Sequence, residues 1–271
     1  MLEELSLGKH FFEMGALLRN SMLVNKILVN SEVWYGLTQT EIETLEDVDK
    51  TLIRKILGAH SKTPIESLYL EMGLIPLRYI IKSRRVMYLK YLISQDKDTL
   101  LAKFLKAQMS NPKKRDWYLD VKEDLDFFNL DLEEIKEIKK EKLIKIVKEK
   151  CKQKALEELL GTKKKHTKMD NLQYSSLEIQ PYLKTKYLFK SSTQQIFQLR
   201  THMYNVKANF SHQYEKDNMF CNICDEDTQK HILICEGLDL DHNSKSEKLV
   251  KVKSMKTFLE TIPTKCMKCL K

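Results

Sequence analysis

Residues 63–76, Thr-Pro-Ile-Glu-Ser-Leu-Tyr-Leu-Glu-Met-Gly-Leu-Ile-Pro, hold two helix starts and one helix end in a single short stretch. Pro64 suits the first turn of a helix. Proline has no backbone N–H, and the first N–H groups of a helix have no hydrogen-bond partner within the helix. Gly73 is the residue type that ends a helix in the left-handed conformation, and Pro76 marks the next start. The stretch therefore predicts a short helix followed at once by a longer one that runs to about Gln95.

An apolar helix is predicted upstream of this stretch, over residues 8–30. Phe11, Met14, Leu18 and Met22 follow helical spacing within it. A helix that is apolar on most faces is expected to be buried against other elements.

A further helix is predicted between these two regions. Thr40 and Glu43 have the spacing of a capping box, in which the Thr hydroxyl accepts from the Glu amide and the carboxylate reaches back. Apolar residues then recur at intervals of three and four up to Gly58, which suits the end of a helix.

Helical periodicity also continues downstream. It predicts a long charged helix over residues 132–160, and a helix over residues 192–206 with Ile196, Leu199 and Met203 facing inward. Only 7 Gly and 5 Pro occur in 271 residues, which disfavours a turn-rich all-β protein. The fold class expected is mainly α.

Targeting and membrane signals are missing from the sequence. No run of 18 apolar residues occurs, so no membrane span is expected. The first residues, Met-Leu-Glu-Glu-Leu, lack the basic and apolar parts of a signal peptide. Four of the 6 Cys form C-x2-C pairs, which is typical of reduced, intracellular metal sites. The expected location is the nucleus, the cytoplasm or both.

One C-x2-C pair is followed by an H-x3-C pair. Together they supply four ligands, the number that a closed tetrahedral zinc site needs: Cys221, Cys224, His231 and Cys235. Because His231 and Cys235 are one helical turn apart, both can face the metal from one short helix. The sequence therefore predicts zinc as the cofactor. The alternative is that these are buried thiols beside an unrelated histidine.

A second C-x2-C pair, Cys266 and Cys269, stands at the end of the sequence. It could join Cys221 and Cys224 in an all-cysteine site, or form half of a site that a C-terminal continuation completes. The alternative, which we favour, is a frayed tail with idle thiols.

Positive charge is concentrated in the middle of the chain. The net charge is +9, yet residues 136–212 alone hold 18 Lys and Arg against 7 Asp and Glu, a balance of +11. Such a segment beside a zinc module indicates a polyanion, of which nucleic acid is the commonest. The alternative is a solvated lysine-rich helix.

Seven cations are the candidate nucleic-acid contacts. Three form a stripe on the helix predicted after Pro76, three form a linker after the long charged helix, and one precedes the zinc ligands: Arg78, Lys82 and Arg85; Lys163, Lys164 and Lys165; and Arg200. For the first three, ordinary solvent exposure is the alternative.

Four stretches together resemble one family, the non-LTR (LINE-like) retrotransposon reverse transcriptases, in the region that follows the catalytic palm. The stretches are Leu17-Leu-Arg-Asn-Ser-Met-Leu23 with Asn30-Ser-Glu-Val-Trp-Tyr-Gly36; Leu45-Glu-Asp-Val-Asp49 with Ile56-Leu-Gly58; Thr63-Pro-Ile-Glu66 through Lys82-Ser-Arg-Arg85; and Leu199-Arg200, Asn209-Phe210 and Cys221 to Cys235, in which Thr228-Gln-Lys-His231 leads to the last Cys. The likeness runs from about residue 10 to residue 237. It implies a helical thumb-like region and a Cys/His module that hold template RNA and target DNA near a polymerase site.

The resemblance also shows what the sequence lacks. The family's catalytic Tyr-x-Asp-Asp has no match, since Tyr118-Leu-Asp120 continues to Val121 and no Asp-Asp pair occurs. Two-metal nucleotidyl transfer needs paired carboxylates. No catalytic residue is therefore assigned, and an upstream palm domain becomes an expected partner if the native gene encodes one.

The sequence predicts five regions and is compatible with two functions. The regions are a helical thumb-like region (1–95), a connector with the long charged helix and basic linker (96–165), a helical segment (166–212), a CCHC zinc module (213–240) and a loose tail (241–271). The leading function is a non-catalytic fragment of a retroelement reverse transcriptase that binds RNA or DNA. The alternative is a zinc-stabilised helical module that binds another protein and no nucleic acid.

Overall fold

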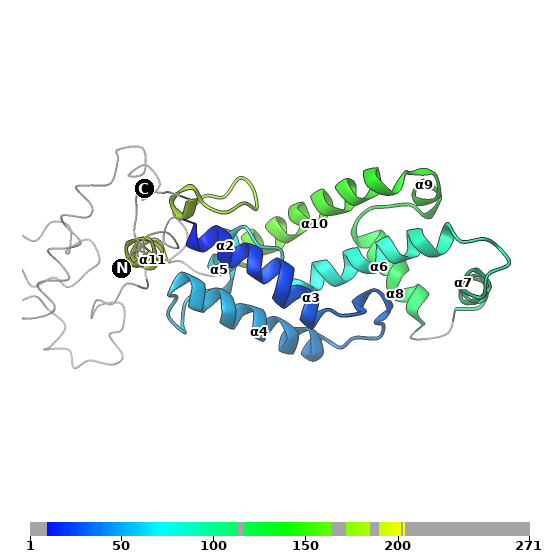
Figure 1. Cartoon of the computed structure of the whole chain (residues 1–271), viewed down its shortest axis with the longest axis horizontal. Coiled ribbons are helices and arrows are strands. Elements are labelled where there is room, and N and C mark those ends of the chain that lie inside the picture. Colours follow the sequence, from blue (N-terminus) through cyan, green and yellow to red (C-terminus); the bar gives the residue numbers. More distant parts are fainter. Residues whose placement is uncertain (1–9, 113–115, 164–171, 185–189, 202, 204–271) are drawn as a thin grey trace, which may run out of the picture.

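The computed structural model describes residues 10–112, 116–163, 172–184, 190–201 and 203 (Figure 1). Of the described residues 74% are helical, and they form no strand beyond a single bridge between Met72 and Ile179. The prediction of a mainly α fold is confirmed. No helix in the described part of the chain is long and apolar enough to cross a bilayer.

From α2 to α10 the described helices follow one another closely along the chain. In chain order they are α2 (Phe11–Leu18), the π-helix η1 (Arg19–Leu23), α3 (Val24–Ile27), the 3-10 helix η2 (Ser31–Val33), α4 (Gln39–Leu57), α5 (Ile65–Met72), α6 (Leu77–Ile93), α7 (Leu100–Ser110), α8 (Trp117–Phe127), α9 (Leu132–Glu137), α10 (Lys140–Lys163), the 3-10 helix η4 (Pro181–Lys184) and α11 (Lys190–Arg200). The central one is α6, because α4, α7, α8, α9, α10 and η2 all contact it.

One apolar core joins these helices. Its buried side chains come from α2, α4, α5, α6, α8, α10 and α11, for example Phe12, Ile53, Tyr69, Val86, Val121, Val147 and Phe197. A second, smaller cluster joins Val24 and Leu28 to Leu77 and Ile81 of α6. The core is therefore continuous through the regions 1–95, 96–165 and 166–212. The division into regions itself stays a prediction.

The helix boundaries around residues 63–76 lie where the sequence predicts them. Pro64 and Pro76 directly precede α5 and α6, and Gly73 ends α5 with φ of +59°. A Cβ atom at Gly73 would lie 2.2 Å from the backbone of Glu178 and Ile179. Only glycine meets both requirements, and the backbone at Glu178 and Ile179 can pass this close to the end of α5 because residue 73 has no side chain.

The start of α4 differs from the prediction. The capping box is formed by Thr38 and Glu41, two residues before the predicted pair, with the Glu41 amide donating to the Thr38 hydroxyl. Both pairs have the required spacing, but Gly36 takes a φ of +64° and turns the chain early enough for Thr38 to be the first cap. The predicted end of this helix, Gly58, is confirmed by its left-handed conformation.

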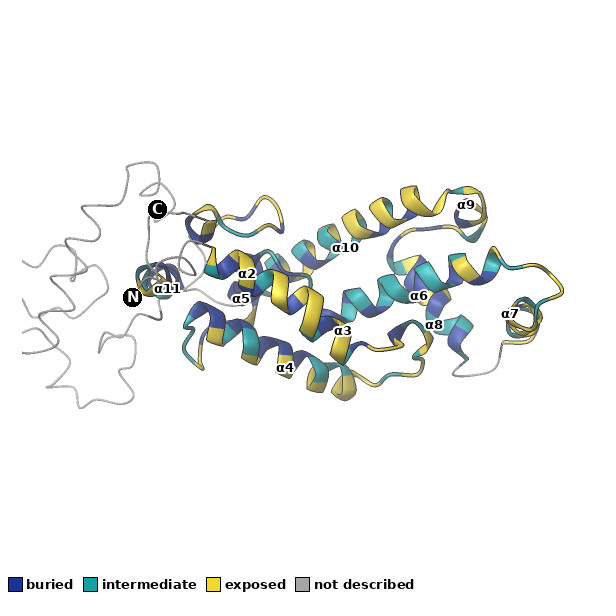
Figure 2. Cartoon of the chain, in the orientation of Figure 1, coloured by how far each residue is buried: buried dark blue, intermediate teal, exposed yellow. Residues whose placement is uncertain are grey.

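The N-terminal apolar helix presents a different face from the one predicted. Met14, Leu18 and Met22 are 43%, 50% and 52% exposed, so the predicted burial is wrong for this part of the helix, whereas Val24 and Leu28 are buried as predicted. The buried face instead carries Gly15, which approaches Ile56 of α4 closely, and Arg19, which is fully enclosed. Figure 2 shows exposed residues, in yellow, along α2 and α3.

The long charged helix is two helices. Ile138 takes an extended conformation between α9 and α10, and this breaks the predicted helix of residues 132–160 near its start. Downstream, α10 passes through the predicted end at Gly161 and stops at Lys163. The helix α11 lies within the predicted range 192–206 apart from its first turn, and Ile196, Leu199 and Met203 are buried as predicted.

Side chains of α11 also cap α4. Gln194 Nε2 donates to the carbonyl of Ile56 at 2.9 Å, and Gln198 Nε2 donates to the carbonyl of Gly58 at 2.7 Å. These carbonyls are among those that a helix C-terminus leaves without an intrahelical partner.

Candidate nucleic-acid interface

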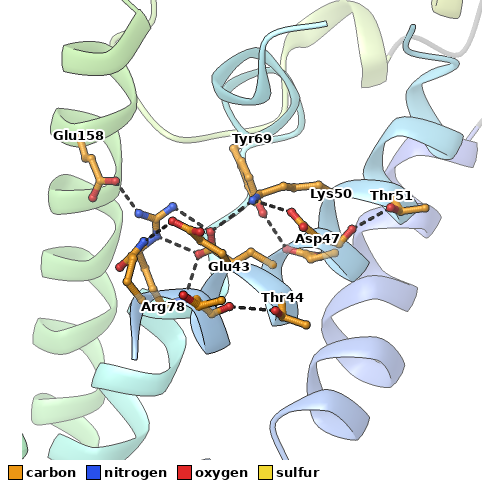
Figure 3. Close-up of polar contacts among 12 residues, drawn as sticks. Glu43, Thr44, Asp47, Lys50, Thr51, Tyr69, Arg78 and Glu158 are labelled. Atoms are coloured by element: carbon orange, nitrogen blue, oxygen red, sulfur yellow. Dashed lines mark hydrogen bonds and ion pairs between the residues drawn. The ribbon is translucent and has the colours of Figure 1, made fainter. Parts of the chain in front are cut away.

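The basic stripe predicted on α6 lies among carboxylates. Arg78 forms a two-point ion pair with Glu46 of α4, with Nε–Oε1 at 2.9 Å and Nη2–Oε2 at 2.8 Å. Its third nitrogen, Nη1, donates to Glu158 Oε1 of α10 at 2.8 Å. Figure 3 shows Arg78 between Glu158 on α10 and the side chains of α4. The guanidinium thus joins three helices, and the Glu46 and Glu158 charges raise the pKa of Arg78 although burial opposes this.

Farther along α6, Arg85 and Lys82 share one carboxylate. Arg85 donates to both oxygens of Asp124 on α8, at 2.6 and 3.0 Å, and also to Asp120 Oδ2 at 3.1 Å. Lys82 Nζ donates to Asp124 Oδ1 at 2.8 Å. Asp124 is 0% exposed and Arg85 is 6% exposed. Ordinary solvent exposure, the alternative given for this stripe, is therefore wrong for Arg85.

The cation predicted just before the zinc ligands is also paired. Arg200 Nε donates to Glu71 Oε1 of α5 at 3.0 Å, and the Tyr174 hydroxyl donates to the same oxygen at 2.7 Å. The guanidinium lies over the Tyr182 ring, 5.2 Å from its centroid. Burial disfavours the charge on Arg200, but Glu71 more than compensates and raises its pKa. This pair fastens α11 to α5.

A fourth buried pair was not singled out from the sequence. Arg19 of η1 donates to both oxygens of Asp49 on α4, at 2.8 and 2.5 Å, and its Nη2 also donates to the Ile75 carbonyl at 2.9 Å. The Tyr69 hydroxyl donates to Asp49 Oδ2 at 3.2 Å. The sequence signal for this pair was an arginine in a mainly apolar helix. An arginine that such a helix carries into the core is almost always paired with an acidic residue.

These pairs bear on four of the seven predicted nucleic-acid contacts. Arg78, Lys82, Arg85 and Arg200 each lie within ion-pair distance of a buried carboxylate. Their role in joining helices follows directly from this geometry. Their assignment as nucleic-acid contacts stays a prediction.

Lysines of α10 have a different environment. Lys142, Lys145 and Lys148 are exposed, and no carboxylate in the described part of the chain forms an ion pair with them. Spacings of three residues place them along one side of the helix. Leu143 and Val147, which are buried, hold the helix against the core from the other side. The arrangement presents ammonium groups in a row on a firmly packed helix, whose exposed residues are yellow in Figure 2.

The remaining predicted site residues lie at or beyond the edge of the described structure. Lys163 is the last residue of α10, and Lys164 and Lys165 follow outside the described residues. The four predicted zinc ligands also lie outside them, as do Cys266 and Cys269. Within the described residues no group of three or more His, Cys, Asp or Glu side chains could hold a metal. The zinc site therefore stays a prediction.

One cysteine lies within the described residues. Cys151 of α10 is buried against α6, where its thiol donates to the Tyr79 carbonyl at 3.6 Å. Burial raises the pKa of this thiol to about 12. A thiol that stays protonated at neutral pH is a poor nucleophile and a poor metal ligand, so Cys151 acts here as a packing residue.

Comparison with protein-family models, with curated proteins and with solved structures finds no match for this chain. The resemblance to non-LTR retrotransposon reverse transcriptases therefore rests on the sequence motifs alone and stays a prediction.

Proposed function

We propose that this chain is a non-catalytic, nucleic-acid-binding region of a retroelement reverse transcriptase, in which α10, the basic linker and a zinc module hold template RNA or target DNA. The observation that supports it best is the row of exposed lysines on α10, Lys142, Lys145 and Lys148, which form no ion pair with the described residues and lie within a segment of net charge +11. Lysine suits this role, because its compact ammonium group pairs with backbone phosphates without selecting a base.

In this proposal the two sets of cations have separate tasks. Arg78, Lys82, Arg85 and Arg200 join helices, since each already pairs with a carboxylate. Phosphate contacts come from the α10 lysines and from Lys163, Lys164 and Lys165. The partners are RNA or DNA and an upstream palm domain, and the location is intracellular.

Binding to labelled single-stranded RNA and DNA, followed by anisotropy across salt concentrations, tests the proposal. Replacing Lys142, Lys145 and Lys148 together by Gln is expected to weaken binding to all sequences alike. The slope of log affinity against log salt should fall by roughly 0.7 for each lost phosphate contact on a single strand.

The control replaces by Gln three exposed lysines on and just before α7, Lys97, Lys103 and Lys106, of which Lys103 lies 3.9 Å from Asp98 in an exposed ion pair. It removes the same charge from another surface and should leave most of the affinity and slope unchanged. Equal losses in both variants would mean that only net charge matters, and the assignment to α10 would be wrong.

Zinc is tested by elemental analysis of the purified chain. We expect one zinc per chain, lost in the Cys224→Ser, His231→Ala double variant and kept in the Cys266→Ser, Cys269→Ser variant. Because a structural zinc site contributes its binding free energy to folding, the first variant should also lose ordered structure in the module. The opposite pattern would assign the metal to the second C-x2-C pair.

A second candidate function has an observation of its own. Met14, Leu17, Leu18 and Met22 form an exposed apolar row on α2 and η1. Apolar rows of this kind mark protein interfaces. If the chain shows no affinity for RNA or DNA at low salt, the alternative of a zinc-stabilised protein-interaction module replaces the first proposal.

A further inference from the structure

An open groove of about 590 Å³ lies between the chain that follows η2 and the first turns of α4. One wall is made by Val33, Trp34 and Tyr35, and the other by Glu41, Thr44 and Leu45. We call it the 33–45 groove. Tyr35 is 58% exposed and Val33 is also exposed, so large apolar side chains face solvent here.

The backbone that carries these apolar side chains is fixed by hydrogen bonds to side chains of α6 and α8. The Trp34 carbonyl accepts from Arg85 Nη1 at 3.3 Å, and the Gly36 amide donates to Asp120 Oδ2 at 2.8 Å. Trp117 Nε1 of α8 donates to the Glu32 carbonyl at 2.8 Å. Three anchors from α6 and α8 therefore fix a segment of five residues, which lowers the ordering cost of binding a ligand there.

The charge of this region is opposite to that of the chain. Residues 31–49 hold six acidic residues and no Lys or Arg, in a chain of net charge +9. Two of the six, Glu46 and Asp49, are buried and paired with Arg78 and Arg19. The exposed ones include Glu41, which lines the groove, and Glu43 on the same helix. Hydrogen bonds from Thr38, first from its backbone, lower the pKa of Glu41 and keep its carboxylate charged.

We propose that the 33–45 groove binds a basic, apolar peptide segment of another protein. Leucine-sized side chains of such a segment fit between Tyr35 and Leu45, and its lysines or arginines face the α4 carboxylates. Charge complementarity selects this occupant, because residues 31–49 offer no cation to a phosphate group and would repel one. The proposal stands on the groove alone and does not depend on nucleic-acid binding elsewhere.

Two threonines of α4 provide a matched pair for the test. Thr44 lines the groove, and Thr51 lies two turns further along the same helix, outside it. Both are exposed, and both hydroxyls donate to the carbonyl four residues earlier, at 2.9 Å for Thr44 and 2.7 Å for Thr51 (Figure 3). Thr44→Arg fills the groove with a bulky cation, whereas Thr51→Arg makes the same chemical change outside it.

The probe is a fluorescein-labelled peptide of fourteen residues, with leucines at helical spacing and lysines elsewhere, titrated with the full chain. A second peptide carries glutamate in place of every lysine. We expect the lysine peptide to bind the unaltered chain and Thr51→Arg equally, and Thr44→Arg about tenfold more weakly or worse. The glutamate peptide should not bind. Circular dichroism checks that both variants keep their helices.

Three outcomes would overturn the proposal. Equal binding of the two peptides would show that charge does not select the occupant. Equal weakening in Thr44→Arg and Thr51→Arg would place the peptide outside the groove. Binding of a labelled oligothymidylate of twenty residues to a chain with Lys142, Lys145 and Lys148 replaced by Gln, changed by Thr44→Arg and unchanged by Thr51→Arg, would make the groove a nucleic-acid site. None of these changes the outcome of the α10 lysine experiment, so the two proposals fail separately.

Discussion

The cations of α6 and those of α10 belong to two helices that pack against each other, yet they meet different surroundings. Arg78, Lys82 and Arg85 point toward carboxylates of α4, α8 and α10, whereas Lys142 and Lys148 point to solvent. The spacing of charges along each sequence is similar. What differs is the side on which each helix meets its neighbours, since α6 is covered by six elements. A basic stripe therefore indicates a ligand only when the packing leaves it uncovered.

The largest difference between the α6 cations and the α10 lysines is expected in the free energy of unfolding of the variant Arg85→Ala. This substitution removes two of the three side-chain hydrogen bonds that the buried Asp124 carboxylate receives from the described residues and leaves the one from Lys82, so the cost is expected near the lower end of the about 3–5 kcal/mol for breaking a buried pair. The free energy of unfolding in urea measures it. Lys145→Ala is the control and should change stability by less than about 0.5 kcal/mol. If Arg85→Ala left stability unchanged and weakened RNA binding, the division of tasks between α6 and α10 would be reversed.

A second effect tests whether α10 stays packed on α6. With a pKa of about 12 against an ordinary 9, the Cys151 thiol carries about a thousandfold less thiolate at pH 8. Alkylation of Cys151 by iodoacetamide should therefore be slower by about that factor than in the urea-unfolded chain, as followed by peptide mapping. Raising the pH toward 12 should speed it. Rapid labelling at pH 8 would mean that the two helices separate readily.

A smaller effect concerns α4, which supplies Glu46 to the α6 cations. Thr38→Ala removes the cap of this helix and should cost about 1 kcal/mol of unfolding free energy. Thr40→Ala, at the position that the sequence suggested, should cost less, because Thr40 lies inside the first turn and a helix interior favours Ala. Urea titrations of both variants compare them directly. A larger loss of unfolding free energy in Thr40→Ala than in Thr38→Ala would indicate that Thr40 caps the helix, as the sequence predicted.

The smallest effect is expected from the α10 lysines themselves. Replacing Lys142, Lys145 and Lys148 by Gln should change the free energy of unfolding by less than about 0.5 kcal/mol, because exposed side chains without partners contribute little. Urea unfolding of the triple variant measures this. A loss of several kcal/mol would place these lysines with the structural cations of α6.

The fold class and several helix ends could be predicted because their signals are local. Pro64, Gly73 and Pro76 act within one turn of the chain, so their neighbours in sequence are sufficient to interpret them. The start of α4 shows the limit of such signals, since Thr38–Glu41 and Thr40–Glu43 are equally good capping boxes in sequence. The turn at Gly36 decides between them.

The pairing of the candidate site residues could not be predicted, because their partners are distant in sequence. Asp124 lies 39 positions from Arg85, and Glu71 lies 129 positions from Arg200. The face of the N-terminal helix was mistaken for a related reason. Counting apolar side chains favoured Met14 and Met22, whereas the fold buries Gly15 for its small size and Arg19 for its ion pair with Asp49.

The glutamine caps on α4 have a consequence for the order of events during synthesis. Gln194 and Gln198 follow the carbonyls that they serve by 138 and 140 positions. At a synthesis rate of 5–20 residues per second, the two glutamines leave the ribosome roughly 7–28 s after the carbonyls that they bind. Water must satisfy them until then. The C-terminal end of α4 is therefore completed late, and a chain interrupted before residue 190 would carry this helix with an open end.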